Sequence, residues 1–256
     1  MSKADLPRRR IALVAGVLVV LCAACSKGGT DSGAGRNTTL LVSIAASLRV
    51  PFDDLATAFE RTHPDVNVEL NPGPTGRLID AIKAAAPVDV IAVAGDLTTL
   101  LGGSHIDEAH AFASNELVVA FPGGVNTEIG SADDLAAVDA LAICAPAATC
   151  GSLADSVLAG LVNPPEPSTI SRAGDAGETT AALTTGDADA ALIYLSDAIN
   201  AGPGYSHISL PGRPRTTYTI AVVSTTDAKS EANAFVDTVR STYGRTVFAE
   251  AGFATP

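Results

Sequence analysis

The chain contains no tryptophan, and only 4% of its residues are aromatic. Aromatic side chains form the stacking platforms on which proteins bind single-stranded nucleic acid. Basic residues are also few, with 16 Lys and Arg against 28 Asp and Glu, a net charge of −12, and no basic stripe. Such a stripe is the usual sign of a nucleic-acid interface. We therefore expect no nucleic-acid partner.

The sequence also lacks the short motifs of common enzyme classes. It contains no G-x-S-x-G, H-E-x-x-H or G-x-x-x-x-G-K-[ST] segment. The carboxylates Asp53, Asp54 and Glu60 fit the solvated face of a helix. The histidines share no spacing typical of a metal site; they are His63, His105, His110 and His207. We expect a protein that is not an enzyme, with no catalytic residue, no bound metal cation and no cofactor.

Residues 1–24 have the pattern of a secretion signal. The basic segment KADLPRRR precedes the apolar run IALVAGVLVVLCAA, which is too short for a comfortable membrane span. The run ends in CAAC, Cys22–Cys25, which fits either a redox or metal C-x-x-C or a cleavage site, and its position favours cleavage. It resembles the bacterial lipobox, with Cys22 where leucine is usual. We expect Cys25 to be lipidated, which places the protein outside the cytoplasm, anchored to the outer face of the cell membrane.

Cleavage before Cys25 removes four basic residues and one acidic residue, which leaves a net charge of −15. Residues 25–39 are rich in Gly, Ser and Thr and fit a flexible tether. Of the remaining cysteines, Cys144 and Cys150 form one pair in an oxidising compartment. We expect a disulfide there, and a reactive pair of free thiols is the alternative.

From residue 40 onward, short apolar runs alternate with amphipathic stretches. This rhythm indicates an α/β fold with mainly parallel sheets flanked by helices. The expected strands lie in residues 39–47, 65–73, 88–95, 115–124 and 216–227, and residues 139–152 fit a strand followed by a loop. The expected helices lie in 50–64, 75–87, 153–162 and 230–253, and residues 177–198 fit a helix, a Gly turn and a strand.

Four predicted helix starts follow small residues, in AAS (45–47), GPTG (73–76), TCGS (149–152) and GDAGE (174–178). A helix start offers unpaired N–H groups and the positive end of a dipole, and therefore suits an anion. Each taken alone is more typical of an ordinary helix cap. Tyr194, at a strand end, fits either a core position or a site hydroxyl.

The segment 43–96, which contains SIAASL and APVDV, resembles the start of ModA-type molybdate-binding proteins of ABC importers. The segments ETTAALTTGDADAALIYLSDA and YGRTVFAEAGF resemble later parts of the same family. The resemblance covers nearly all of residues 40–256. It implies a two-lobed periplasmic-binding-protein fold with a ligand cleft between the lobes. It places residues 40–116 and 219–256 in lobe 1 and residues 117–218 in lobe 2, with a hinge near 117 and 218.

The resemblance also implies the ligand-binding residues, which hold the oxyanion with neutral donors. Ser47 matches the serine of the AASL motif, and Thr75 stands where the family has serine. The backbone N–H groups fall on Cys150 and, in a looser match, on Ala176. Tyr194 matches the family tyrosine. If the 144–150 bridge forms, it either orders the loop so that the Cys150 N–H faces the cleft or acts only as a structural staple.

The implied function is capture of molybdate, and of tungstate, by a monomer that delivers it to an ABC permease. A same-fold receptor for sulfate or another oxyanion is the alternative, although sulfate receptors often use a tryptophan donor. A ferric-iron receptor would need neighbouring tyrosines, and the four tyrosines are dispersed in sequence. An extracytoplasmic hydrolase lacks its motifs here, and an adhesion protein would bind no small ligand.

Overall fold

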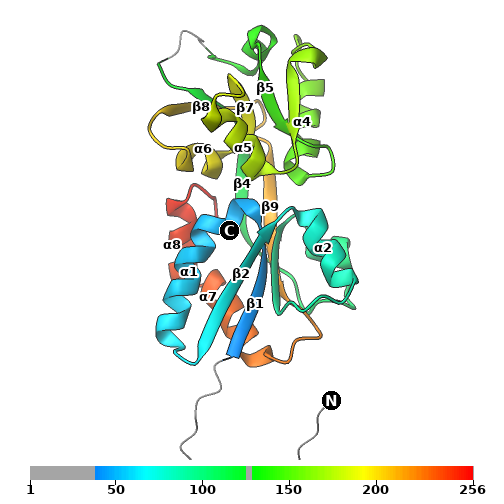
Figure 1. Cartoon of the computed structure of the whole chain (residues 1–256), viewed down its shortest axis with the longest axis vertical. Coiled ribbons are helices and arrows are strands. Elements are labelled where there is room, and N and C mark those ends of the chain that lie inside the picture. Colours follow the sequence, from blue (N-terminus) through cyan, green and yellow to red (C-terminus); the bar gives the residue numbers. More distant parts are fainter. Residues whose placement is uncertain (1–37, 125–128, 256) are drawn as a thin grey trace, which may run out of the picture. The chain divides into compact units, whose positions relative to one another are not determined.

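The structure is a computed structural model that describes residues 38–124 and 129–255. Strands and helices alternate through most of these residues (Figure 1). The strands are β1 (Thr38–Ala45), β2 (Val66–Gly73), β3 (Val90–Ala94), β4 (His110–Pro122), β5 (Leu141–Cys144), β6 (Ile170–Ala173), β7 (Ala190–Tyr194), β8 (Tyr205–Ser209) and β9 (Arg215–Val222). The α-helices are α1 (Arg49–Thr62), α2 (Thr75–Lys83), α3 (Leu97–Leu101), α4 (Thr149–Ala159), α5 (Ala176–Thr185), α6 (Leu195–Asn200), α7 (Lys229–Arg240) and α8 (Thr242–Glu250). Three short 3-10 helices are η1 (Ala46–Leu48), η2 (Ala132–Ala137) and η3 (Pro167–Thr169).

The first section of the sheet has the strand order β2-β1-β3-β9-β4. Its strand β1 is parallel to both β2 and β3, and every residue of β3 is buried. Strands covered on both faces are expected to be apolar throughout. One face carries α1, which buries Phe52, Leu55 and Phe59 at helical spacing in a core shared with α7 and α8. The other face packs against α2 and α3.

The second section contains the end of β4 together with β7, β5 and β6, and β8 pairs with β4 outside this order. Here β5 is parallel to both β6 and β7. Residues of η2 and α4 pack on one face, and residues of α5 and α6 pack on the other. The second section therefore repeats the helix–sheet–helix layering of the first.

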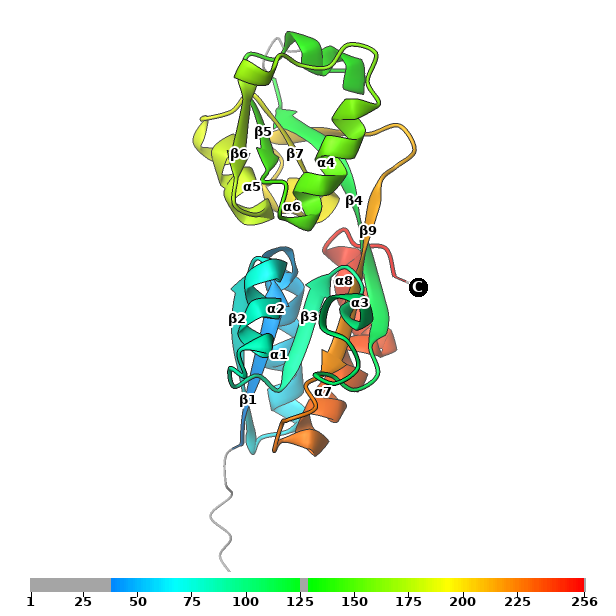
Figure 2. The ribbon, with the colours of Figure 1, turned by 90° about the vertical axis from the view of Figure 1, so that its right-hand side faces the viewer.

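Strands β4 and β9 connect the two sections (Figure 2). Residues 110–116 of β4 pair with β9, and residues 117–120 pair with β7. Every antiparallel pairing between described strands involves β4 or β9, whereas the other pairings are parallel. The α/β class is confirmed, and the sheet is mixed because these connecting strands run against their neighbours. The described residues cluster as one unit, and the predicted lobe boundaries stay a prediction.

Several predicted elements have different limits in the structure. The strand predicted for residues 115–124 begins at His110, because residues 110–116 gain partners on β9. Helix α4 begins at Thr149, four residues before the predicted start, and therefore contains Cys150. Strand β1 begins at Thr38, so the last two residues of the predicted tether belong to the sheet.

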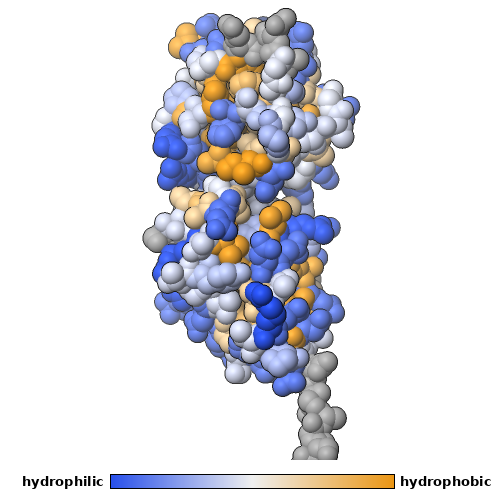
Figure 3. Space-filling model, turned by 90° about the vertical axis from the view of Figure 1, so that its left-hand side faces the viewer, coloured by the Kyte–Doolittle hydropathy of each residue, from blue (hydrophilic) through white to orange (hydrophobic). Residues whose placement is uncertain are grey.

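The predicted signal segment 1–24 and the predicted lipidation site Cys25 lie outside the described residues. Among the residues that are described, no helix is long and apolar enough to cross a membrane. The face drawn in Figure 3 is largely hydrophilic, with small apolar areas between polar ones. The exposed large apolar side chains come from separate elements, and they are Val50, Val162, Ile199 and Tyr243.

Candidate ligand-binding site

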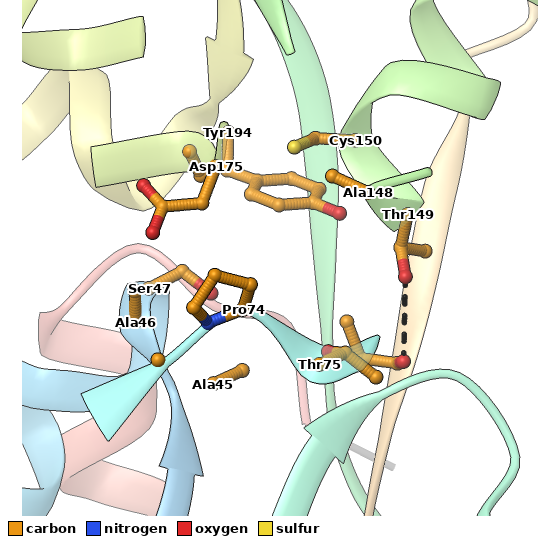
Figure 4. A pocket seen from close by; sticks show the side chains of 13 residues that line it. Ala45, Ala46, Ser47, Pro74, Thr75, Ala148, Thr149, Cys150, Asp175 and Tyr194 are labelled. Atoms are coloured by element: carbon orange, nitrogen blue, oxygen red, sulfur yellow. Dashed lines mark hydrogen bonds between the residues drawn. The ribbon is translucent and has the colours of Figure 1, made fainter. Parts of the chain in front are cut away.

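A small cavity that is partly open to solvent lies between the two sections of the sheet. Its walls come from the ends of parallel strands and the helix starts that follow them. This is the usual ligand position in sheets of this kind. From the first section the lining residues are Ala45, Ala46, Ser47, Gly73, Pro74, Thr75 and Ala94. From the second section they are Ala148, Thr149, Cys150, Asp175, Ala176 and Tyr194 (Figure 4).

The structure brings together all five residues that the sequence predicted for the site, and all four predicted helix starts. Ser47 lies in η1 directly before α1, Thr75 begins α2, Cys150 is in the first turn of α4, and Ala176 begins α5. Tyr194 is the last residue of β7. Their shared location is an observation, whereas their role as ligand donors stays a prediction.

The helix starts differ in how their first N–H groups are occupied. No described side chain caps η1, α2 or α4, whose N-cap residues are Ala45, Pro74 and Ala148. Uncapped N–H groups keep their capacity to bind an anion. Helix α5 is different, because the Asp175 carboxylate accepts a hydrogen bond of 2.9 Å from the Glu178 N–H. This cap occupies the N–H of Glu178 and not that of Ala176, the predicted site residue of α5.

Two buried tyrosines connect the site hydroxyls to strand β9. Ser47 Oγ lies 2.9 Å from the Tyr218 hydroxyl, and either group can be the donor. The Tyr194 hydroxyl donates to Thr216 Oγ1 at 3.2 Å. Burial raises the pKa of Tyr194 to about 12, so the phenol stays protonated at neutral pH. The sequence did not indicate Tyr218 or Thr216, because their side chains meet the site only through long-range packing.

No lysine, arginine or histidine is among the described residues that line the cavity. Asp175 is the one charged residue in that described lining, an acceptor that the sequence analysis did not single out. Behind it, in α6, Asp197 Oδ2 is buried without a hydrogen-bond partner among the described residues. Burial and, to a smaller extent, the nearby Asp175 carboxylate raise the pKa of Asp197 to about 7. Among the described lining residues, helix dipoles and backbone N–H groups are the sources of positive potential for an anion.

A hydrogen bond joins the two sections at the edge of the cavity. The Thr149 hydroxyl donates to the Ala94 carbonyl oxygen at 3.5 Å, the dashed line in Figure 4. Ala94 ends β3 and Thr149 begins α4, so this contact spans the space between a strand of the first section and a helix of the second.

The two cysteines of the loop before α4 are bonded in the structure, and both are buried. The bridge ties the end of β5 to the first turn of α4 and places Cys150 on the cavity wall. Gly151 fits this crowded turn because an added Cβ would lie 1.9 Å from the Ala145 carbonyl oxygen. Loop and helix start therefore approach each other more closely than any larger residue at position 151 allows.

Within the described ranges, no group of three or more His, Cys, Asp or Glu side chains is arranged to hold a metal ion. Two of the histidines have local partners: His63 contacts Thr62 and the Phe59 carbonyl oxygen, and His105 contacts Ser104.

Two crossing strands, a cavity between two α/β sections, and helix starts facing that cavity define a periplasmic-binding-protein fold. The family model "Bacterial extracellular solute-binding protein" matches residues 40–254, and the chain belongs to this family.

Comparison with individual proteins confirms the resemblance to ModA-type proteins. The chain is 28% identical over 254 residues to the molybdate-binding protein ModA of Mycobacterium tuberculosis, which covers 95% of each chain. It is 22% identical to the putative ABC transporter substrate-binding lipoprotein YvgL of Bacillus subtilis, over 91% of this chain and 93% of the relative.

Solved structures share the fold. The periplasmic molybdate-binding protein of Azotobacter vinelandii matches with a TM-score of 0.74 and 21% identity, over 85% of this chain and 99% of that one. The sulfate-binding protein SubI of Mycobacterium tuberculosis matches with a TM-score of 0.71 and 19% identity, over 84% and 86%.

Proposed function

We propose that this protein is a lipid-anchored receptor that captures molybdate, and also tungstate, in the cavity and delivers it to an ABC permease. It acts outside the cytoplasm as a monomer with one ligand per chain, and it does no chemistry on that ligand. The mycobacterial relatives named for molybdate binding support this assignment.

The observation that carries the proposal is the convergence of four helix starts on a cavity without cationic side chains. A tetrahedral dianion accepts several hydrogen bonds at once, and bonds to a charged acceptor are stronger than neutral ones. Helix N-termini supply such donors without a counter-ion. A protein with a net charge of −15 therefore binds an anion through local dipoles.

Titration calorimetry on residues 26–256 with molybdate, tungstate and sulfate in turn tests the proposal. We expect 1:1 binding of molybdate and tungstate and negligible binding of sulfate. A folded sample, checked by circular dichroism, that binds none of the three would refute the proposal.

A sulfate receptor is the second candidate, and the structural likeness to SubI favours keeping it in the test. A molybdate receptor and a sulfate receptor differ in their relative affinities for the two anions. A cavity shaped for the larger molybdate holds sulfate with longer, weaker hydrogen bonds. Sulfate binding as tight as molybdate binding would assign the cavity to oxyanions in general.

Removal of single hydroxyls tests the site residues. Ser47→Ala and Tyr194→Phe should each weaken molybdate binding by about 1–3 kcal/mol, because each removes a hydroxyl that the proposal assigns as a donor to a charged acceptor. For Tyr194, ligand binding exchanges its hydrogen bond to Thr216 Oγ1 for one to the anion. Both variants should still unfold cooperatively on heating. Affinities unchanged in both variants would remove these hydroxyls from the ligand-binding set.

Lipid anchoring is tested separately, since Cys25 lies outside the described residues. We expect the full chain to enter the detergent phase in phase partitioning and the variant Cys25→Ser to stay in the aqueous phase. Equal partitioning of the two proteins would contradict lipidation at Cys25. The Bacillus relative named as a lipoprotein supports the expectation.

A further inference from the structure

The buried Tyr218 hydroxyl lies against a predicted ligand residue without lining the cavity itself. Tyr218 is 0% exposed, and its hydroxyl is 2.9 Å from Ser47 Oγ. Ser47 is 9% exposed and lines the cavity. Its hydrogen bond to Ser47 gives Tyr218 an indirect route to a ligand.

The hydrogen bond between the two hydroxyls has two directions with different consequences. If Ser47 donates to Tyr218, the Ser47 proton is used and its lone pairs face the cavity, which repels an anion. If Tyr218 donates to Ser47, the Ser47 proton stays available to the cavity. A hydroxyl that accepts a hydrogen bond is also polarised into a stronger donor.

The surroundings favour Tyr218 as the donor when an anion is bound. Burial raises the pKa of Tyr218 well above its usual value, and the Tyr194 hydroxyl raises it further, so Tyr218 keeps its proton. A buried O–H group without an acceptor is costly. Donation from Tyr218 to Ser47, and from Ser47 to the anion, gives both protons an acceptor.

The Tyr218 ring is held in place by other aromatic rings. Its centroid lies 6.4 Å from that of Phe112, 5.5 Å from that of Phe253 and 6.2 Å from that of Tyr194, all in edge-on arrangements. Its backbone is fixed by pairing with Ala94, the last residue of β3, which lines the cavity. The hydroxyl therefore has a defined position from which to orient Ser47.

The same strand also orients the other predicted site hydroxyl. Thr216 precedes Tyr218 by two residues on β9, and side chains two residues apart project from the same face of a strand. Thr216 Oγ1 accepts from Tyr194, which ends β7 in the second section. Strand β9 thus holds one predicted site hydroxyl of each section, Ser47 and Tyr194, by a hydrogen bond.

We propose that Tyr218 is a positioning residue, which donates to Ser47 Oγ and thereby holds the Ser47 proton toward an oxyanion in the cavity. This inference rests on the proposed function. It assigns to Tyr218 an effect on ligand affinity that depends on the presence of the Ser47 hydroxyl.

A double-mutant cycle tests this dependence. Molybdate affinity is measured by calorimetry for the unmodified protein, Tyr218→Phe, Ser47→Ala and the double variant. We expect Tyr218→Phe to weaken binding about three- to tenfold when Ser47 is present and by less than about twofold when Ser47 is replaced. A purely structural role would reduce affinity by the same factor in both backgrounds.

Tyr205→Phe is the matched control, because it removes a phenol hydroxyl that donates to the Thr184 carbonyl oxygen outside the cavity. Its affinity should equal that of the unmodified protein. Tyr218→Phe keeps the ring and all its aromatic contacts, so we expect it to fold, and a thermal melt without ligand checks this.

Two results would overturn the inference while leaving the proposed function intact. One is molybdate binding by Tyr218→Phe that equals the unmodified protein, and the other is equal loss in both Ser47 backgrounds. Absence of binding by the unmodified protein is a different result, since it refutes the proposed function and the inference with it.

Discussion

At the scale of single residues, Asp197 is the side chain whose chemistry departs most from its usual state. Its Oδ2 is buried without a partner among the described residues. An ionised carboxylate is strongly destabilised in such a place, so the proton is retained instead. The neighbouring negative charge of Asp175 acts in the same direction. Asp197 is therefore protonated in the folded protein at a pH where an exposed aspartate is ionised.

This shift predicts how stability depends on pH. The pKa of Asp197 is about 7 in the folded protein against 3.8 for the ordinary group. Between these values the folded state holds a proton that the unfolded state has lost, so the free energy of unfolding falls as pH rises. The contribution changes by at most about 1.4 kcal/mol per pH unit.

The neutral, similarly shaped variant Asp197→Asn should lack this contribution. Relative to it, the unmodified protein should lose stability from pH 4 to pH 7 in urea unfolding experiments. Asp80→Asn, at an exposed position of α2, is the control and should follow the unmodified protein. Parallel pH profiles for the unmodified protein and Asp197→Asn would contradict a raised pKa.

At the scale of elements, the loop between β5 and α4 is the part most closely fitted to the cavity. Its Ala145 N–H donates to the Ala173 carbonyl oxygen at 2.6 Å, and Arg172 donates to the Cys144 carbonyl oxygen at 3.2 Å. Strand β6, which supplies both groups, was not predicted, because ISRA is short and partly exposed. Strand β8 was missed for the same reason.

Reduction of the 144–150 bridge should weaken molybdate binding more than it lowers the melting temperature. The bridge closes a loop with a sequence separation of 6, and so short a loop contributes only about 2–3 kcal/mol to stability. Its larger effect is to order in advance the turn that carries the Cys150 N–H.

Calorimetry and thermal melts with and without reductant, and with Cys144→Ser/Cys150→Ser, measure the two effects. A large drop in melting temperature with unchanged affinity would leave the bridge as a structural staple. Free thiol in the untreated protein, detected with a thiol reagent, would instead favour the reactive pair.

At the scale of the whole molecule, an ion pair lies where β4 changes partners. Glu116 is 4% exposed and ends the stretch that pairs with β9, and Leu117 begins the stretch that pairs with β7. Arg213 Nε contacts both Glu116 carboxylate oxygens, at 3.0 and 2.9 Å, and Arg215 contacts one at 3.4 Å. Burial is the largest single influence and raises the pKa of Glu116, but the hydrogen bonds from Arg213, Ser209 and Arg215 and the charge of Arg213 together hold this pKa below its usual value.

Glu116→Gln should lower the free energy of unfolding by about 1–2 kcal/mol at pH 7, because it removes charge-assisted hydrogen bonds. The pKa of Glu116 is lower in the folded protein than its ordinary value of 4.5. The stabilisation by ionised Glu116 is therefore present above pH 4.5 and is lost as the pH falls through the pKa of the folded state. The difference between variant and unmodified protein should therefore shrink toward pH 3. Glu69→Gln, at an exposed position on β2, is the control. A difference that persists at pH 3 would assign the effect to packing.

The sequence by itself determined the α/β class, most strands and helices, and the four helix starts. The assignment of Ser47, Thr75, Cys150, Ala176 and Tyr194 to one site came from the family resemblance. These features depend on local chemistry: periodicity sets strands and helices, and small residues mark where helices begin. Family resemblance added the two-lobed fold and the ligand class.

Only the tertiary structure decided which groups face one cavity and which lie behind it. Residues 47 and 218 meet because β9 returns beside β3 after more than a hundred residues, and no local pattern encodes that pairing. The Asp175 carboxylate at the cavity and the buried Asp197 oxygen likewise depend on how α5 and α6 pack. Local sequence sets what each segment can form, whereas long-range packing sets burial and neighbours, and these control hydrogen-bond direction and protonation.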